Sequence, residues 1–170
     1  MIKDKVLVRC VVNGKEVAEY VDPRESLLDM LRNRLGLTSV KKGCEVGECG
    51  ACTVIIDGET IDSCILSGSV GGGKKYPYPG RSGKERGSYP YSGGFLLRRE
   101  RSSAVFCTPG FVMSATVLLE RGEVLTREAI KKHMSGNLCR CTGYQNIVNA
   151  VEKVMLEQQE TEGVLIYDTE

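Results

Sequence analysis

Hydrophobic and polar residues alternate along residues 4–12, which is the pattern of a β-strand with one buried face. The dipeptide Asn13-Gly14 follows at once, and it favours the two-residue turn of a β-hairpin. We therefore predict that residues 15–21 return as a second, antiparallel strand.

A helix is predicted from Ser26 to Gly36, because leucines recur there at helical spacing and glycine commonly ends a helix. After a loop rich in glycine and cysteine, residues 53–56 and 59–64 form a second predicted hairpin around Asp57-Gly58. Strand pair, helix and strand pair together indicate an α+β domain in which one sheet packs on one helix. The leucines that share the helical face are Leu27, Leu28, Leu31 and Leu35.

The second half of the sequence has helical periodicity. Residues 111–121 are mostly apolar and follow Pro109-Gly110. Thr126 is placed to cap a helix over residues 127–134, and residues 145–156 repeat apolar side chains at helical spacing. Short helices with short connections predict a small all-α bundle.

Residues 66–104 differ in composition from their surroundings. They hold nine of the 20 glycines, three of the five prolines and four of the seven tyrosines. Their net charge is +6, whereas the rest of the chain carries −5. A flexible linker between two domains is one interpretation, and a basic, tyrosine-bearing arm for nucleic acid is another. Because no nucleic-acid-binding motif accompanies the arm, we expect no nucleic-acid partner.

The composition of the chain limits the kinds of site and partner that it can have. It has 170 residues, with eight cysteines, one histidine and a net charge of +1. One histidine excludes any site that needs two imidazoles, and the small net charge gives no general reason to expect an anionic partner. No apolar run is long enough for a membrane-spanning helix, and the N-terminus alternates like a strand, unlike a signal peptide. We expect a cytoplasmic protein, in which cysteines indicate metal binding before disulfides.

Three of the cysteines share one loop and a fourth lies on the next strand pair, which is the spacing of a plant-type [2Fe–2S] site. These cysteines are Cys44, Cys49, Cys52 and Cys64. Gly43, Gly47 and Gly50 lie among them, and glycines let backbone N–H groups approach cluster sulfurs. Zinc bound by four thiolates is the alternative, but zinc ribbons usually pair two short Cys-x2-Cys knuckles. The spacing therefore favours an iron–sulfur cluster.

A second group of cysteines lies in the helical half. Cys139 and Cys141 flank Arg140, and two ligands so close together must be completed from elsewhere. Cys107, just before Pro109-Gly110, is the natural third ligand. A fourth is missing, because Cys10 lies in the first predicted strand, where the pattern calls for a small buried hydrophobic residue.

Three segments occur in a distinctive order along the chain: CEVGECGAC at 44–52, CTPGFVM at 107–113 and GNLCRCTGY at 136–144. Together they closely resemble the small iron–sulfur subunit of molybdenum hydroxylases, the family of xanthine dehydrogenase, aldehyde oxidoreductase and carbon monoxide dehydrogenase. The resemblance covers residues 4–65 and 104–157.

The resemblance implies an α+β architecture with two domains and a tail. An N-terminal β-grasp domain, like that of plant ferredoxins, would occupy residues 1–78. An all-α, [2Fe–2S]-binding helical bundle would follow over residues 79–160, and residues 161–170 would form a C-terminal tail.

The resemblance also implies a ligand set for each cluster. Cys44, Cys49, Cys52 and Cys64 would hold the first, and the second would use a Cys-x2-Cys pair and a Cys-x-Cys pair. Cys107, Cys139 and Cys141 match three of the latter positions, but the fourth is Ala104, preceded by Ser103 where the family has a glutamine near the pterin.

Two explanations of Ala104 are open. One is a true loss of the ligand, which would leave the second cluster absent or labile. The other is that residues from a point after Cys64 to Phe106 are a frame-shifted reading of an ordinary family sequence. In support, residues 102–106 can be encoded by codons whose shifted frame reads Gln-Cys-Gly-Phe.

The function implied by the resemblance is electron transfer within a hetero-oligomer. A molybdopterin-binding large subunit would hydroxylate the substrate, and electrons would pass through the second and then the first cluster to FAD on a medium subunit or to an external acceptor. Family geometry would place Cys139 against the pterin. We expect no substrate site on this chain. A free ferredoxin-type carrier and a zinc-binding module with a basic arm are the alternative functions.

The remaining polar residues near these motifs are predicted to have other roles. Glu45 and Glu48 are expected to face solvent or a partner subunit. Arg140 can offset the negative charge of a cluster. His133 is expected to be an ordinary residue of its helix, since it lies six positions before Cys139.

Overall fold

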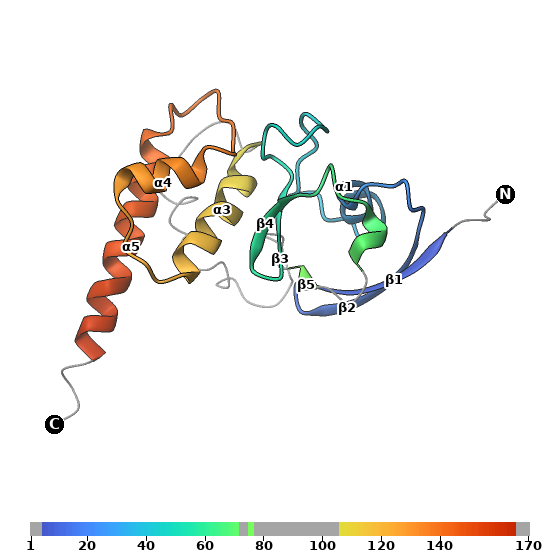
Figure 1. Cartoon of the computed structure of the whole chain (residues 1–170), viewed down its shortest axis with the longest axis horizontal. Helices are drawn as coiled ribbons and strands as arrows, with labels where there is room; N and C mark the ends of the chain where they lie inside the picture. The colour runs from blue at the N-terminus through green and yellow to red at the C-terminus, as the bar shows by residue number, and fades with distance from the viewer. Residues whose placement is uncertain (1–4, 72–74, 77–105, 166–170) are drawn as a thin grey trace.

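The computed structural model describes residues 5–71, 75–76 and 106–165. Strands and one short helix form the N-terminal part, and three helices gather at the other end of the molecule (Figure 1). This confirms the predicted α+β class, with a ferredoxin-like part followed by an all-α part. The predicted domain boundary between residues 78 and 79 lies outside the described residues.

The first hairpin is formed by β1 (Val6–Val12) and β2 (Lys15–Val21), paired antiparallel as predicted. Asn13 and Gly14 both have positive φ, of 52° and 75°, which matches the strand twist on either side of a two-residue turn. On the inner face of β1, Val8, Cys10 and Val12 are buried.

The predicted helix over 26–36 has a different form in the structure. The Ser26 side chain caps it by accepting the N–H of Asp29, and α1 (Leu27–Asp29) then widens into the π-helical segment η1 (Met30–Arg34). The Leu35 N–H accordingly donates to the Met30 carbonyl, five residues back. The apolar face is buried as the pattern predicted, and Gly36 follows with a φ of 68°.

The second hairpin joins β3 (Thr53–Ile56) to β4 (Glu59–Asp62), and β4 is two residues shorter than predicted. The chain leaves the strand after Asp62 because the first turn of α1 has N–H groups without partners inside the helix. The carbonyl groups of Ser63 and Leu66 accept the N–H groups of Leu28 and Leu27. Capping the helix therefore draws the segment that carries Cys64 against α1.

Part of the stretch with foreign composition belongs to this first domain. Ser67 forms a β-bridge with Ser26, the 3₁₀ segment η2 (Gly68–Gly71) follows, and β5 (Lys75–Tyr76) pairs parallel with β1. The remaining residues of 66–104 lie outside the described residues, so the linker and the basic arm are untested.

The helical part contains α3 (Thr108–Glu120), α4 (Arg127–Met134) and α5 (Gln145–Leu165). Thr126 caps α4 as predicted, by accepting the N–H of Ala129. Helix α3 begins three residues earlier than predicted, with Pro109 in its first turn, where a missing N–H costs nothing. Helix α5 continues to Leu165, past the predicted end at residue 156, so the expected tail over 161–170 is partly helical. Glutamine and glutamate have good helix propensity and extend α5 beyond its buried face.

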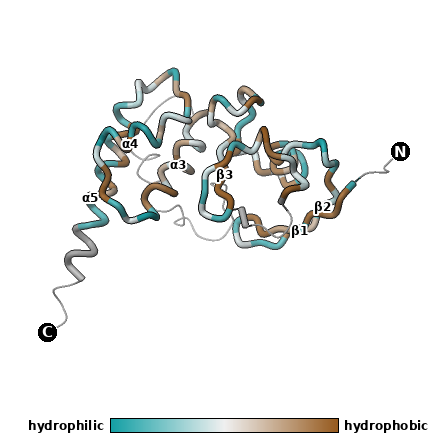
Figure 2. The backbone as a smooth tube through the Cα atoms, viewed as in Figure 1, coloured by the Kyte–Doolittle hydropathy of each residue, from teal (hydrophilic) through white to brown (hydrophobic). Residues whose placement is uncertain are grey.

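Strand β3 lies between the two parts, beside α3 (Figure 2). Val54 and Ile56 face the ferredoxin-like core, whereas Ile55 points the other way into the helical core. This alternation lets one short strand contribute to both cores. No helix among the described residues is long and apolar enough to cross a lipid bilayer.

Candidate iron–sulfur centres

Cys44 lies in a loop whose backbone turns toward its sulfur. The N–H groups of Val46 and Glu48 donate to Cys44 Sγ at 3.5 and 3.3 Å. The intervening turns need the left-handed region at Glu45 and Gly47, with φ of 63° and 77°. These hydrogen bonds lower the pKa of Cys44 from 9.0 to about 6, so the loop favours a thiolate, the form that binds metal.

The four cysteines of the first predicted site are arranged as two pairs. The side chains of Cys44 and Cys49 are hydrogen-bonded neighbours, and so are those of Cys52 and Cys64. In a [2Fe–2S] cluster each iron takes two of the four thiolates, so two pairs are the arrangement it needs. The pairing of these cysteines is thus consistent with a two-iron cluster.

Cys52 differs from Cys44 in being buried, with 2% of its surface exposed. Burial raises the pKa of the Cys52 thiol to about 12, with Cys64 and the Asp62 carboxylate contributing. Cys52 Sγ lies 3.6 Å from Asp62 Oδ1, and the Thr53 hydroxyl oxygen lies 3.3 Å from the same carboxylate oxygen. A metal centre held by this sulfur would have to displace a tightly held proton.

The difference between these sulfurs predicts a pattern of chemical reactivity. In iron-depleted chain at pH 7, iodoacetamide should modify Cys44 before Cys52 or Cys107, because Cys44 is above its pKa and the other two are far below theirs. The Cys44 rate should fall as the pH drops below about 6, where its thiolate becomes protonated. Mass spectrometry of the alkylated peptides measures each rate. Chain unfolded in guanidinium is the control, and equal rates in the folded chain would contradict the prediction.

The second predicted site lies where the loop before α5 meets the start of α3. Cys107 immediately precedes α3, and its side chain is hydrogen-bonded to that of Cys139. The Thr142 hydroxyl and N–H donate to Cys139 Sγ at 3.1 and 3.4 Å. Burial would raise the pKa of Cys139, but these hydrogen bonds outweigh it and lower that pKa. Burial and the neighbouring Cys139 raise the pKa of Cys107 to about 11.

Cys141 is exposed, whereas Cys139 is buried with 9% of its surface accessible. The expectation that Cys139 lies against a partner's pterin stays a prediction, and the structure adds that the more exposed sulfur of this loop is that of Cys141. The side chains of Cys107 and Cys139 form one hydrogen-bonded pair, and Cys141 lies two residues further along the loop. Position 104, like Ser103, lies outside the described residues, and its alanine supplies no donor. Three of the four thiolates for a second cluster are thus present.

Tyr144 fixes the shape of this second loop. Its hydroxyl accepts the Cys139 N–H at 2.9 Å, and its ring meets Phe111 edge-on with centroids 6.0 Å apart. The residue has a φ of 66°, in the left-handed region that non-glycine residues rarely adopt. These contacts hold Tyr144 in that conformation and tie the loop to α3.

The other candidate residues have the places that the sequence suggested. Cys10 is buried in the ferredoxin-like core, opposite Val17 on β2. His133 is half-buried on α4, with Nε2 3.0 Å from the Ser114 carbonyl oxygen. The remaining three are exposed on the two cysteine loops: Glu45, which pairs with Lys42 at 2.9 Å, Glu48 and Arg140.

The two cysteine loops are hydrogen-bonded to each other. The Leu138 N–H donates to the Cys49 carbonyl at 3.0 Å. The buried Asn137 amide donates to the Gly50 carbonyl at 2.9 Å and to Thr53 Oγ1 at 3.2 Å, and it accepts the Ser114 hydroxyl at 2.6 Å. We name these contacts the Asn137 junction. Sequence reasoning missed the junction, because Asn137 stands in the GNLCRC segment without any local sign of a partner 87 residues away.

Two glycines make this close approach possible. A Cβ at Gly50 would overlap the Gly136 carbonyl and the Asn137 amide, and a Cβ at Gly110 would overlap the Gly50 carbonyl. Gly50 also has a φ of 65°. The two domains therefore meet backbone to backbone at the first turn of α3.

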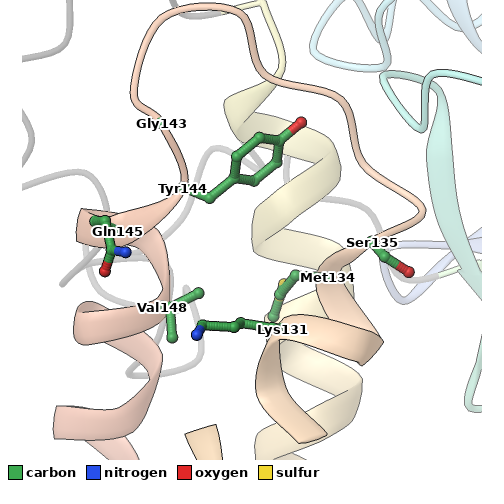
Figure 3. A pocket seen from close by; sticks show the side chains of 7 residues that line it. All are labelled: Lys131, Met134, Ser135, Gly143, Tyr144, Gln145 and Val148. Atoms are coloured by element: carbon green, nitrogen blue, oxygen red, sulfur yellow. The ribbon is translucent and has the colours of Figure 1, made fainter. Parts of the chain in front are cut away.

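A pocket of about 410 Å³ lies between α4 and α5, under the loop that carries Tyr144. Figure 3 shows Lys131 from α4 and Val148 from α5 facing the same space beside the Tyr144 ring. The described lining offers an amine, hydroxyls and an amide but no carboxylate, imidazole or thiol. It lacks the acid–base pair that a catalytic site for hydrolysis or proton transfer would use.

Both halves of the chain match family models of iron–sulfur domains. Residues 10–74 match the 2Fe-2S iron-sulfur cluster binding domain, and residues 95–152 match the [2Fe-2S] binding domain. The fold and the paired cysteines thus define a protein with two [2Fe–2S]-binding domains.

Relatives cover nearly the whole chain. It is 43% identical over 148 residues to the nicotine 6-hydroxylase small subunit of Paenarthrobacter nicotinovorans, covering 87% of this chain and 88% of that one. It is 39% identical over 156 residues to the xanthine dehydrogenase iron-sulfur-binding subunit of Escherichia coli O157:H7, covering 87% and 93%. Quinoline 2-oxidoreductase of Pseudomonas putida 86 superimposes with a TM-score of 0.83 at 33% identity, covering 95% and 99%. The chain belongs to the family of small iron–sulfur subunits of molybdenum hydroxylases.

Proposed function

We propose that this chain relays single electrons from the molybdenum centre of a molybdopterin-binding large subunit to FAD on a medium subunit or to an external acceptor. The relatives named for nicotine 6-hydroxylase and xanthine dehydrogenase are subunits of larger enzymes, which supports a role that depends on partners. A cytoplasmic location, where thiols stay reduced, suits the eight cysteines.

We propose the ligands by residue. Cys44 with Cys49 and Cys52 with Cys64 would hold the two irons of the first cluster, and Cys107 with Cys139 would hold one iron of the second. Cys141 would bind the other iron, whose second thiolate is missing at Ala104. When bound, each cluster takes up and releases one electron at a time.

The observation that carries the proposal is the hydrogen bond from the Leu138 N–H to the Cys49 carbonyl, 3.0 Å long. Leu138 is bonded directly to Cys139, so this contact joins a proposed ligand of one centre to a proposed ligand of the other. Electron tunnelling is faster across covalent and hydrogen bonds than across empty space. The buried Asn137 holds the two loops in register and fixes the length of this route.

Exposed apolar side chains beside each centre support contact with two partners. Leu138 is exposed in the second loop, next to Cys139, whereas Val46 and Ile65 are exposed at the first loop, where Ile65 lies beside Gly47. Apolar surface that a chain leaves open in this way is typical of interfaces. We propose that the large subunit docks over Leu138 and the electron acceptor over Val46 and Ile65.

The alternative functions explain less of the structure. A free ferredoxin-type carrier needs one centre and has no use for the Asn137 junction or for a second cysteine loop. A zinc ribbon usually pairs two short Cys-x2-Cys knuckles, whereas these cysteines have the plant-type spacing and the two side-chain pairs that a two-iron cluster needs. The basic arm of that alternative lies outside the described residues.

Co-expression with the large and medium subunits tests the proposed function. We expect the chain to co-purify with molybdenum and flavin, to carry iron, and to be reduced when substrate is added. Cys49→Ser should abolish the EPR signal of the first cluster, whereas Cys10→Ala should leave it intact, because Cys10 lies in the core away from both loops. Stoichiometric zinc without iron–sulfur absorbance, or an iron-containing chain that binds neither partner, would contradict the proposal.

A further inference from the structure

Resting on the proposed function, we propose that the Asp62 carboxylate lowers the reduction potential of the first cluster. Asp62 is the last residue of β4, and its Oδ1 lies 3.6 Å from Cys52 Sγ. It is neither a proposed ligand nor part of the electron route. It would act through the sulfur beside it, by adding negative charge.

The hairpin geometry fixes this distance. Asp62 pairs directly with Thr53 in the β3–β4 register, and Cys52 is bonded to Thr53. Both strands are short and joined by the tight Asp57-Gly58 turn, and β3 is buried throughout. The carboxylate therefore cannot move far from the sulfur while the strands remain paired.

Few hydrogen-bond donors or cations offset the negative charge of the Asp62 carboxylate. The Thr53 hydroxyl is 3.3 Å from Asp62 Oδ1 but only 2.7 Å from the Gly50 carbonyl, and its one proton serves the shorter contact better. Among the described residues, no lysine or arginine lies within ion-pair distance of Asp62.

Cluster binding would turn the interaction between Cys52 and Asp62 from attraction into repulsion. A thiol at Cys52 can donate a hydrogen bond to the carboxylate, but a metal-bound sulfur has no proton to donate. The carboxylate then faces an anionic sulfur that is 2% exposed, while Asp62 itself is half-buried, so water screens the pair only from the Asp62 side. An added electron increases the negative charge of the cluster, and the fixed carboxylate opposes it. Asp62 itself gains neither proton nor electron in this step.

The test is EPR-monitored redox titration of the assembled enzyme with Asp62→Asn. At the midpoint potential of the wild-type first cluster, the ratio of reduced to oxidised cluster should rise about tenfold, which is 59 mV for a one-electron couple. Any signal from the second cluster should keep its midpoint. Asp57→Asn is the matched control: it removes the same charge from the same hairpin at the turn, beyond the far end of β4, a strand that spans about 10 Å. Asparagine also tolerates the positive φ of 52° at that position.

Asp62→Glu separates charge from shape, because it retains the carboxylate and should keep a midpoint near that of the wild type. An unmoved midpoint in Asp62→Asn, a shift equal to that of Asp57→Asn, or an equal positive shift in Asp62→Glu would overturn the proposal for Asp62 alone. If wild-type enzyme showed no iron–sulfur signal, the proposed function would fail, and this inference with it.

Discussion

Gly110→Ala is expected to destabilise the folded chain by about 3 kcal/mol, as overpacking of a rigid contact does. Within a helix, replacing glycine by alanine usually increases stability, so the destabilisation expected here is opposite to that rule. Here the added Cβ would overlap the Gly50 carbonyl, which belongs to the first cysteine loop and cannot swing aside like a flexible side chain. The loss should appear as a lower midpoint in chemical denaturation and as faster proteolysis between the domains.

Gly136→Ala is the matched control for Gly110→Ala. It lies in the partner loop of the same junction, but a Cβ there has no neighbour within 4 Å. We expect its stability to match that of the wild type. Equal stability of the two variants would show that the domains do not meet backbone to backbone at Gly110.

Ala104→Cys is expected to complete the second centre. With three thiolates, one iron of that cluster would have only Cys141 as a protein ligand, and such a cluster is readily lost. A fourth cysteine should raise the iron content of the purified chain from about two towards about four atoms, as expected for two two-iron clusters, and should add a second EPR signal. Ser103→Cys is the control, because it places a thiol one residue away from the matching position.

Wild-type chain that already contains two complete clusters would contradict this assignment. Sequencing the coding DNA across residues 66–106 bears on the same question. Under the frame-shift hypothesis we expect a corrected frame that reads Gln-Cys at positions 103 and 104, and a clean single frame would contradict that hypothesis.

The sequence predicted best those elements that are determined by residues adjacent in the chain. Asn13-Gly14 and Asp57-Gly58 each give a hairpin, and all four residues have the positive φ that such turns need. The cysteine spacing and the three motifs were sufficient to identify the family, because ligand spacing and loop glycines follow directly from the chemistry of the centre.

Features that depend on distant contacts could not be predicted. β4 ends at Asp62 because the carbonyl groups beyond it cap a helix more than 30 residues earlier in the sequence. The Asn137 junction requires Gly50 and Gly110 to meet, and the hydrophobic periodicity of the sequence carries no information about such a contact. The proximity of Asp62 to Cys52 follows from strand register, and register is set when the hairpin forms.

The Asn137 junction also makes the two centres interdependent during maturation and damage. If the first loop lost its cluster and its order, the Leu138 N–H and the Asn137 amide would lose the Cys49 and Gly50 carbonyls that hold them. The second loop would then be left without the anchor beside Cys139. Oxidative injury at the first loop would thus also loosen the second, and repair would have to rebuild both together.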